Sequence, residues 1–403
     1  MVAEVKDRRS SRNSGRMDVS PKYRGLGVDP TKRYLALFKG LLDSEFEGAF
    51  TTVLSHPRDR DMGFVLHVDG AGSKPVQAYL NWRELGDGRA FRGIAQDVVA
   101  MNVDDIIAVG AAPVAFADYV SLNAFYVDRG VVLRALCSGF LDCKRLLSEH
   151  GLPMKFAGGE TADLPDQVGT LDVSGCVLGE VGISEVITGG SVGPGDVIVG
   201  LESGGMSSYE KVLNSGIMCN GITMARHCLL SRAYNKLYPE TYRSSGRRYS
   251  GRYKVDDYVD FLGMTVGEAL SSPSRLFAPI VAKVLEKHRH GVRALVHNTG
   301  GGLTKCLRLG SRIHYVKDNL PEPDPIFILI KRESKASWGE MFMDFNMGVG
   351  YELVVKKEVA EDVIGVSESF KVGARIIGRC ERSRGPNRLT VRSKYGTFTY
   401  TKT

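Results

Sequence analysis

The chain has 403 residues, of which 43% are hydrophobic and 25% charged, and its formal net charge is +7. The ordinary apolar fraction argues against disorder, and 47 glycines without a triplet period exclude collagen. No apolar run approaches the ~20 residues that a membrane-spanning helix needs, and the length predicts two globular domains at roughly 150–200 residues each.

The seven cysteines are an odd number, and no two of them have C-x-x-C spacing. This fits neither a disulfide framework nor a zinc site and is typical of a reducing compartment. No apolar signal segment occurs in residues 1–33, so we expect a cytoplasmic protein without a membrane anchor.

The basic excess lies at the two ends of the chain. Residues 1–33 carry nine Lys and Arg against four Asp and Glu, and residues 374–403 carry eight against one. Few aromatic residues are interleaved with these charges, so nucleic-acid binding is disfavoured and solvated termini are expected.

The elements predicted along the chain alternate between helices and strands. Residues 1–20 are expected to be a flexible basic arm, followed by an N-terminal domain over 21–185 and a C-terminal domain over 186–403. The N-terminal domain is predicted to hold a helix from Asp29-Pro30 through 42, a strand at 63–68, a helix at 93–110, a strand at 114–122, a helix at 129–150 and strands at 155–159 and 172–181.

The second domain is predicted to begin after the turn-rich segment at 189–196. Its expected elements are a strand at 197–201, a Tyr- and Arg-rich surface insertion at 232–257, a helix at 279–288 and a strand at 294–298. Such alternation indicates mixed α/β layers rather than a bundle or a sandwich.

Chemistry is suggested by acidic and glycine-rich corners, because the chain has neither a Walker P-loop nor a G-x-G-x-x-G motif after a strand. The corner at 69–74, DGAGSK, offers a carboxylate for a cation, and bare N–H groups and a lysine for phosphate oxygens. The alternative is that residues 69–74 form an ordinary hairpin turn, for which Asp-Gly is a common dipeptide.

Three acids lie on the next helix, where Asp97 and Asp104 are seven residues apart and share a face with apolar neighbours. Acids in such a setting need partners. A divalent cation is one candidate, and caps or salt bridges are the alternative.

Three further corners follow. GGETAD at 158–163 repeats the glycine-and-carboxylate pattern, although a solvated turn fits equally. HNTGGGL at 297–303 ends a strand and is predicted to open a helix, whose free N–H groups suit a phosphate; for His297 the alternative is a satisfied core histidine. FNMGVG at 345–350 suggests close backbone packing or approach to a ligand.

Five segments, taken in their order and approximate spacing, resemble the phosphoribosylformylglycinamidine cyclo-ligases, or aminoimidazole ribonucleotide synthetases: DGAGSK, DVVAMNVDDIIAVGAAPVAFADY, FAGGETADLP, NTGGGLTK and EMFMDFNMGVG. The resemblance covers about residues 25–378. It implies a two-domain α/β fold in which N-terminal strands form a barrel across a homodimer. It also implies ATP- and Mg²⁺-dependent ring closure of formylglycinamidine ribonucleotide to aminoimidazole ribonucleotide in purine biosynthesis.

The resemblance also assigns roles to residues. Asp97, Lys74 and His297 would be catalytic. Magnesium would be held by Asp69, Asp97 and Glu160, with Asp104 or Asp105 as a further ligand. The nucleotide would contact these acids and Gly70, Gly72, Ser73, Lys74, Gly158, Gly159, Thr161, Thr299, Gly300, Gly301, Gly302 and Asn346.

The chain departs from the family pattern in two places. The stretch 45–63 contains no lysine where a glycine-rich, lysine-bearing loop is usual. Met218 and Cys219 stand where the family has His and Ser, and Met cannot transfer a proton, so His227 is the candidate replacement. The alternatives are another ATP-dependent phosphorylating enzyme of the same fold (selenophosphate-synthetase or thiamine-monophosphate-kinase type) or a non-catalytic nucleotide-binding relative.

Overall fold

The computed structural model describes residues 26, 38, 41–44, 46–242 and 248–401. The predicted arm at 1–20 and most of the predicted helix that ends at residue 42 lie outside the described residues. Within the described residues, no helix is both long enough and apolar enough to span a membrane.

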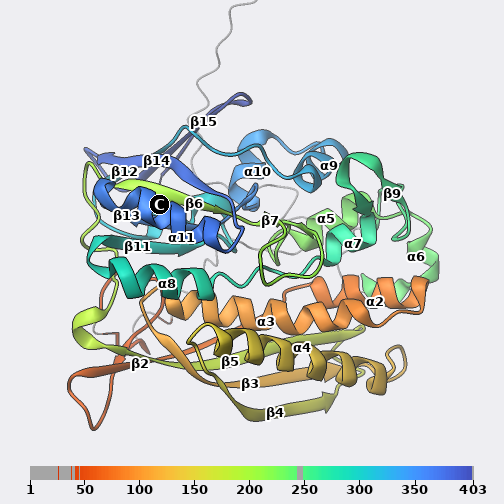
Figure 1. The fold of residues 1–403 in the computed structure, drawn as a ribbon. Helices are drawn as coiled ribbons and strands as arrows, with labels where there is room; N and C mark the ends of the chain where they lie inside the picture. The colour runs from red at the N-terminus through yellow and green to blue at the C-terminus, as the bar shows by residue number, and fades with distance from the viewer. Residues whose placement is uncertain (1–25, 27–37, 39–40, 45, 243–247, 402–403) are drawn as a thin grey trace, which may run out of the picture.

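The N-terminal half is a five-stranded sheet with helices on one face (Figure 1). The strand order is β1-β2-β5-β3-β4; β5 pairs antiparallel with β2 and β3, and β3 pairs parallel with β4. The elements are β1 (Leu54–Ser55), β2 (Met62–Gly70), α2 (Lys74–Leu85), α3 (Arg89–Ile107), β3 (Ala112–Leu122), α4 (Arg129–Glu149), β4 (Lys155–Asp163) and β5 (Leu171–Gly182).

The central helix α3 lies between this sheet and the second domain. Fourteen of its 19 residues are buried, because its apolar side chains cover most of its circumference. The prediction placed this helix at 93–110, and the structure begins it earlier, at Arg89, and ends it at Ile107. Helix α2 was not predicted, because the corner at 69–74 indicated only a turn. Pro75 in the first turn is compatible with its helical start.

The C-terminal half holds a seven-stranded mixed sheet in the order β11-β13-β6-β14-β12-β15-β16. In Figure 1, helix α8 lies between this sheet and α3, and helix α11 lies along the side of the sheet. The sheet elements and larger helices are β6 (Val197–Glu202), α8 (Ala278–His288), β11 (Val292–His297), β12 (Ile313–Lys317), α9 (Pro325–Ser334), α10 (Trp338–Asp344), β13 (Val349–Val355), α11 (Ala360–Ser369), β14 (Ala374–Arg382), β15 (Arg388–Ser393) and β16 (Gly396–Thr401).

Shorter elements connect these parts: 3₁₀ helices, two-residue strands and small helices. They are η2 (Ile183–Glu185), β7 (Gly204–Gly205), β8 (Asn214–Ser215), α5 (Ile222–Leu229), α6 (Tyr234–Leu237), η3 (Pro239–Thr241), β9 (Tyr258–Val259), η4 (Asp260–Leu262), β10 (Met264–Thr265), α7 (Val266–Ser271), η5 (Arg289–Gly291), η6 (Gly302–Arg308) and η7 (Lys357–Val359).

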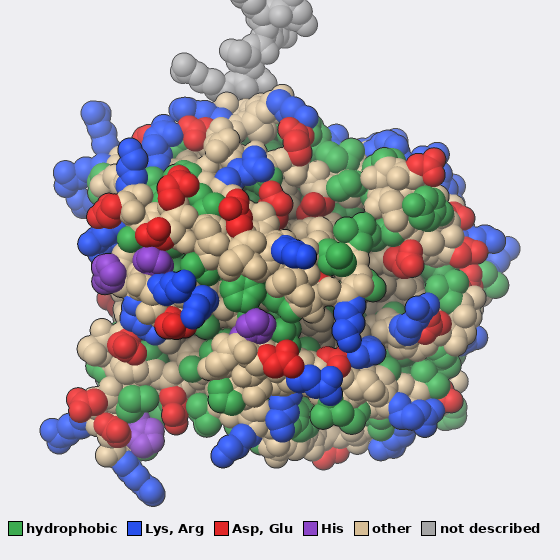
Figure 2. Space-filling model, viewed as in Figure 1, with side chains coloured by type: hydrophobic (Ala, Val, Ile, Leu, Met, Phe, Trp, Pro, Cys, Tyr) green, Lys and Arg blue, Asp and Glu red, His purple; other side chains and the backbone are tan. Residues whose placement is uncertain are grey.

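The basic C-terminal segment is ordered sheet. Along β15, Arg388 and Arg392 are exposed, while Leu389, Thr390 and Val391 between them are buried. The charges are therefore solvated as predicted, but the backbone that carries them belongs to the domain. On the face drawn in Figure 2, Lys and Arg side chains are interspersed with Asp and Glu rather than gathered in one patch.

The polar tract at 232–257 differs from the expected surface insertion. Tyr234, Tyr249 and Val255 are at most 2% exposed, and the tract packs over α2. Its tyrosines can be buried because their hydroxyl groups find hydrogen-bond partners there.

Candidate functional site

The three acids of α3 are all buried and face three different sets of partners. Asp97 and Asp104 have no solvent exposure, and Asp105 is 7% exposed. They extend over more than two turns of the helix, so they form separate groups along it rather than one cluster.

Asp97 holds the buried Lys74. The Lys74 Nζ lies 2.8 Å from Asp97 Oδ1, which also accepts the Ser274 N–H at 2.7 Å. The other oxygen, Asp97 Oδ2, has no hydrogen-bond partner among the described residues. Since Lys74 is fully covered, its ammonium faces Asp97 and not the protein surface.

Asp104 caps helix α8 of the second domain. Its Oδ1 accepts the Ala278 N–H at 2.7 Å, and its Oδ2 accepts the Phe277 N–H at 3.0 Å. Burial raises the pKa of this carboxyl group well above its usual value, although the two N–H groups oppose the shift. The structure thus gives Asp104 the capping role that the sequence left as an alternative.

Asp105 is the point where several predicted segments meet. Its Oδ1 lies 2.7 Å from His297 Nδ1, and its Oδ2 lies 3.6 Å from His67 Nε2 and 3.9 Å from Lys305 Nζ. Burial alone would raise the pKa of Asp105, but Lys305, His297 and His67 together lower it to about 2. Asp105 is therefore an ionised carboxylate surrounded by cationic or polar groups from both domains.

His297 is a fully buried histidine at the end of β11. It stacks on Tyr351, with ring centroids 5.7 Å apart, and burial lowers the pKa of its imidazole despite the nearby Asp105. Its Nε2 lies 4.0 Å from Asp104 Oδ2 and has no hydrogen-bond partner among the described residues. His297 is thus both a core residue and a contact of a predicted site residue.

The corner at 69–73 connects the domains next to these acids. Asp69 is exposed, and its Oδ1 accepts the N–H of Gly70 at 2.8 Å. Gly72 has a φ of +59°, which favours glycine. Ser73 Oγ lies 2.7 Å from Thr223 Oγ1 in the second domain, and the Ser73 carbonyl accepts a hydrogen bond from Arg226 at 2.9 Å.

The glycine corner on β4 lies apart from this group within one chain. Paired residues across the sheet share a face, and the rows Gly70–Ser174–Tyr119–Glu160 and Asp69–Gly175–Asp118–Gly159 run across four strands. Asp69 and Glu160 therefore point to opposite faces and are about 14 Å apart, given a strand spacing of ~4.8 Å. Gly158, Gly159 and Thr161 remain with Glu160 on this edge strand.

The glycine run at 300–302 does not open the α-helix that was predicted. It leads into the 3₁₀ helix η6, and Gly301 and Gly302 have φ values of +101° and +48°. A Cβ atom on Gly302 would lie 2.3 Å from the Phe345 carbonyl oxygen, so the glycine is needed for packing. Gly300 is exposed, and Thr299 accepts a hydrogen bond from Lys305.

Asn346 braces three loops from a buried position. Its Nδ2 donates to the Gly216 carbonyl at 2.9 Å, and its Oδ1 accepts the Gly348 N–H at 2.8 Å and the Ser203 hydroxyl at 3.2 Å. The same junction holds Met218, which is 1% exposed and has a φ of +55°. His227, the candidate replacement for the missing histidine, packs on Tyr249 with ring centroids 4.9 Å apart.

No three His, Cys, Asp or Glu side chains of the described residues form a group that could hold a metal ion. The predicted set Asp69, Asp97, Asp104, Asp105 and Glu160 is thus not brought together within one chain. A cavity of about 920 Å³ lies elsewhere, between the ends of α3 and α4 and helices α8 and α11, and is lined by none of these residues.

Several contact residues were not predicted. His67 precedes Asp69 by two positions on the same strand, so the strand period of two was an available signal. Lys305 is the last residue of NTGGGLTK, one of the segments that resemble the family, so its position was an available signal. Asn102 joins the group by donating to the Asp69 carbonyl at 3.0 Å and contacting His67 Nδ1 at 3.2 Å. Ser274 had no signal, because only folding brings its N–H to Asp97.

Two family models match most of the chain. The model for the AIR synthase related protein, N-terminal domain, matches residues 50–181, and that for the C-terminal domain matches residues 193–388.

Relatives named phosphoribosylformylglycinamidine cyclo-ligase are similar to the chain over most of its length. The Methanocaldococcus jannaschii protein is 33% identical over 319 residues, which cover 79% of this chain and 78% of the relative. The Alkaliphilus metalliredigens protein is 30% identical over 386 residues, which cover 92% and 97%.

Solved structures show a similar fold at low sequence identity. Thermotoga maritima PurL complexed with FGAR has a TM-score of 0.54 at 14% identity, and the match covers 91% of this chain and 48% of PurL, so the chain spans about half of that protein. AaThiL complexed with AMPPCP and TMP has a TM-score of 0.53 at 14% identity, covering 91% and 95%.

Proposed function

The chain belongs to the phosphoribosylformylglycinamidine cyclo-ligase family, and on that premise we propose that it closes the imidazole ring of formylglycinamidine ribonucleotide with ATP. The products are aminoimidazole ribonucleotide, ADP and phosphate. The observation that carries the proposal is the meeting of Asp105 with His297 and Lys305, which come from two separate family-like segments, at one point between the domains.

The chemistry asks for positioning and charge neutralisation more than for a strong nucleophile. An amide oxygen is a poor leaving group, so the γ-phosphoryl group of ATP is first transferred to it and ADP leaves. The neighbouring amidine nitrogen then attacks the same carbon and closes the ring, and the oxygen leaves as phosphate. Such a transfer relies on charge stabilisation and orientation. The exposed backbone at Gly72 and Gly300, the buried ion pair of Lys74 with Asp97 and the nearby cation Lys305 are consistent with that demand.

Magnesium fits the residues present only as a partly protein-bound ion. Asp69 is exposed and Asp105 is ionised, and the two residues are linked by Asn102, which bonds the Asp69 backbone carbonyl, and His67, which contacts Asn102 and Asp105. Mg²⁺ usually takes one or two carboxylates and completes its shell with water and phosphate oxygens, so a three-residue group is not required. When bound, the ion would supply positive charge beside the phosphates.

A homodimer would bring the glycine corner of β4 nearer to this site. The outer face of the N-terminal sheet, on which Glu160 lies, exposes Leu66 by 63%, Val68 by 70% and Tyr119 by 40%. A contiguous apolar face of this kind is typical of a protein interface. We place a second copy of the chain on this face, which is the barrel-forming arrangement that the resemblance implied.

The test is ADP formation by the purified protein with Mg²⁺-ATP. We expect ADP and phosphate only when formylglycinamidine ribonucleotide is present, together with the absorbance or mass of the imidazole product. Thiamine monophosphate and selenide serve as alternative acceptors. ADP formation with either acceptor and not with the ribonucleotide would contradict the proposal, as would tight ATP binding without turnover.

A further inference from the structure

Residues 222–242 and 248–257 of the second domain belong to a segment that contacts helix α2 near both of its ends. In Figure 1, α5, α6 and α7 lie directly above α2, although α2 belongs to the first domain. The first residue of α2 is Lys74, which pairs with Asp97. The position of this ammonium therefore depends on what fixes α2.

At the N-terminal end of α2, helix α5 fixes the residue before Lys74. Thr223 Oγ1 lies 2.7 Å from Ser73 Oγ, and Arg226 donates to the Ser73 carbonyl. Ser73 makes no side-chain capping bond to α2, and its hydroxyl group contacts Thr223 of the second domain instead.

At the C-terminal end of α2, two glutamates and three tyrosines interlock. Glu84 of α2 accepts hydrogen bonds from Tyr234 and Tyr238 of the insertion, one on each carboxylate oxygen. In the opposite direction, Tyr79 of α2 donates to Glu240 of the insertion. Donors and acceptors thus lie on both sides of the contact.

The Tyr79–Glu240 part of this contact is buried, whereas Glu84 is half-buried. Tyr79 is 0% exposed and Glu240 is 6% exposed. Arg83 donates to the Tyr79 hydroxyl at 2.7 Å, and its guanidinium lies 5.4 Å from the ring centroid of Tyr238. Hydrogen bonds to a charged group are stronger than neutral ones, and the surrounding rings exclude water from them.

The insertion is braced internally and is joined to α5 of the second domain through His227. Asn235 Nδ2 donates to the Tyr249 carbonyl at 2.9 Å and Asn235 Oδ1 accepts the Tyr249 N–H at 2.8 Å. The Tyr249 ring contacts His227 of α5. The contacts at the C-terminal end of α2 and the contacts at Ser73 are therefore made by one connected part of the second domain.

We infer that the described residues of the insertion at 232–257 act as an interdomain clamp on α2. In this clamp Glu84 of α2 and Glu240 of the insertion are positioning residues that keep the Lys74 ammonium group at Asp97. The inference rests on the proposed function, because it assigns the clamp to the ATP-dependent reaction. If it is correct, loosening the C-terminal end of α2 at Glu84 changes the position of Lys74, the first residue of the helix, about three helical turns away.

The experiment compares Glu84→Ala, Glu84→Gln and the control Glu322→Ala in the full-length protein. Glu322 also accepts from a tyrosine, Tyr395, and from Lys394, but lies in the second domain away from α2. We expect Glu84→Ala to lower kcat/KM for ATP by roughly three- to tenfold, and Glu84→Gln to have an intermediate effect because its amide keeps one acceptor oxygen. The KM for the ribonucleotide should change less, and Glu322→Ala should leave both values unchanged.

Hydrogen exchange supplies a readout that does not depend on turnover. We expect the amides of residues 76–78 to exchange faster in Glu84→Ala than in the wild type or in Glu322→Ala. Unchanged exchange there, or a lowered melting temperature with unchanged kinetic constants, would overturn the clamp. Absence of turnover in the wild type would instead contradict the proposed function, and the exchange result would still decide whether Glu84 positions α2.

Discussion

Lys74 and Asp97 form an ion pair that is completely removed from solvent, with 2.8 Å between Nζ and Oδ1. Removing one member of such a pair leaves an uncompensated buried charge, which typically destabilises a protein by about 3–5 kcal/mol. The pair therefore affects both folding and the proposed catalysis, and the two effects must be separated by experiment.

We predict that Asp97→Asn abolishes turnover and also lowers the free energy of unfolding, because the Lys74 ammonium then stays buried without its partner. The double variant Lys74→Met/Asp97→Asn should recover part of the stability, since neither charge remains, but no activity. Urea unfolding and ADP formation are the two measurements. Retained activity in either variant would contradict the assigned role of the pair.

The environment of Asp105 predicts its acid sensitivity. Its pKa is lowered in the folded state to about 2, so its contribution to stability is present above the unfolded pKa of about 4 and is lost as the pH falls toward 2. Lys305→Met removes one cause of the lowering, so acid unfolding should begin at a higher pH. Lys283→Met, which affects only an exposed pair with Glu286, is the control and should unfold like the wild type.

His297 predicts a second pH effect, near neutrality. Its pKa is lowered by burial, so the unfolded chain takes up a proton more readily and stability falls as the pH drops below about 6.5. We expect His297→Gln to lose less stability between pH 7 and pH 5 than the wild type. Chemical denaturation at several pH values measures this, and parallel pH profiles would show that His297 is not the group responsible.

Asp344 predicts a stabilising substitution. Burial, together with the nearby Glu340, raises the pKa of this carboxyl group to about 7, and its Oδ2 has no hydrogen-bond partner among the described residues. A raised pKa means that stability present at pH 4 is lost as the pH rises through 7. Asp344→Asn should therefore stabilise the protein at pH 8, by up to about 4 kcal/mol, and have little effect at pH 4. An equal gain at both pH values would point to a cause other than ionisation.

The apolar outer face of the N-terminal sheet predicts the assembly state. Leu66→Glu places a charge in the middle of this face, so we expect it to convert a dimer into a monomer in sedimentation measurements. Leu141 on α4 is similarly exposed, at 56%, but lies on a helix on the other side of the sheet. Leu141→Glu should therefore stay dimeric, and a wild-type monomer would refute the proposed interface.

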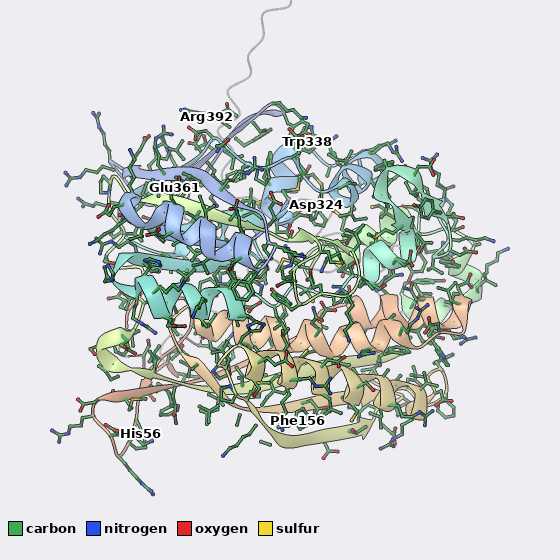
Figure 3. All side chains as sticks on the ribbon, in the orientation of Figure 1. His56, Phe156, Asp324, Trp338, Glu361 and Arg392 are labelled. Carbon is green, nitrogen blue, oxygen red and sulfur yellow. The ribbon has the colours of Figure 1, made fainter. Side chains whose placement is uncertain are left out.

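Sequence patterns predicted some elements of the molecule closely and missed others. Phe156 on β4 and Trp338 on α10, labelled in Figure 3, mark its lower sheet and its upper domain. The strand β3 and the helix α4 were predicted nearly to the residue, because their apolar periods are long and regular. Helix α2 was missed because a glycine-rich corner and an early proline obscured its start.

For the site, the sequence identified the segments but not their pairing. It pointed to Asp105 and His297 as separate candidates, and only the fold showed that they touch, since 192 residues separate them. It grouped Glu160 with Asp69, whereas the register of four strands places them on opposite faces. The local amino-acid sequence cannot distinguish a carboxylate that caps a helix from one that faces a ligand.

The sequence by itself determined the alternation of helices and strands, the family and its chemistry, because short-range periodicity and ordered motifs are properties of the chain. The tertiary structure alone decided which acid pairs with which cation. It alone also decided that the Tyr-rich tract packs against α2. The physical reason is that a buried charge takes its partner from whatever segment packs against it, and that segment is chosen by the apolar surfaces of the whole fold.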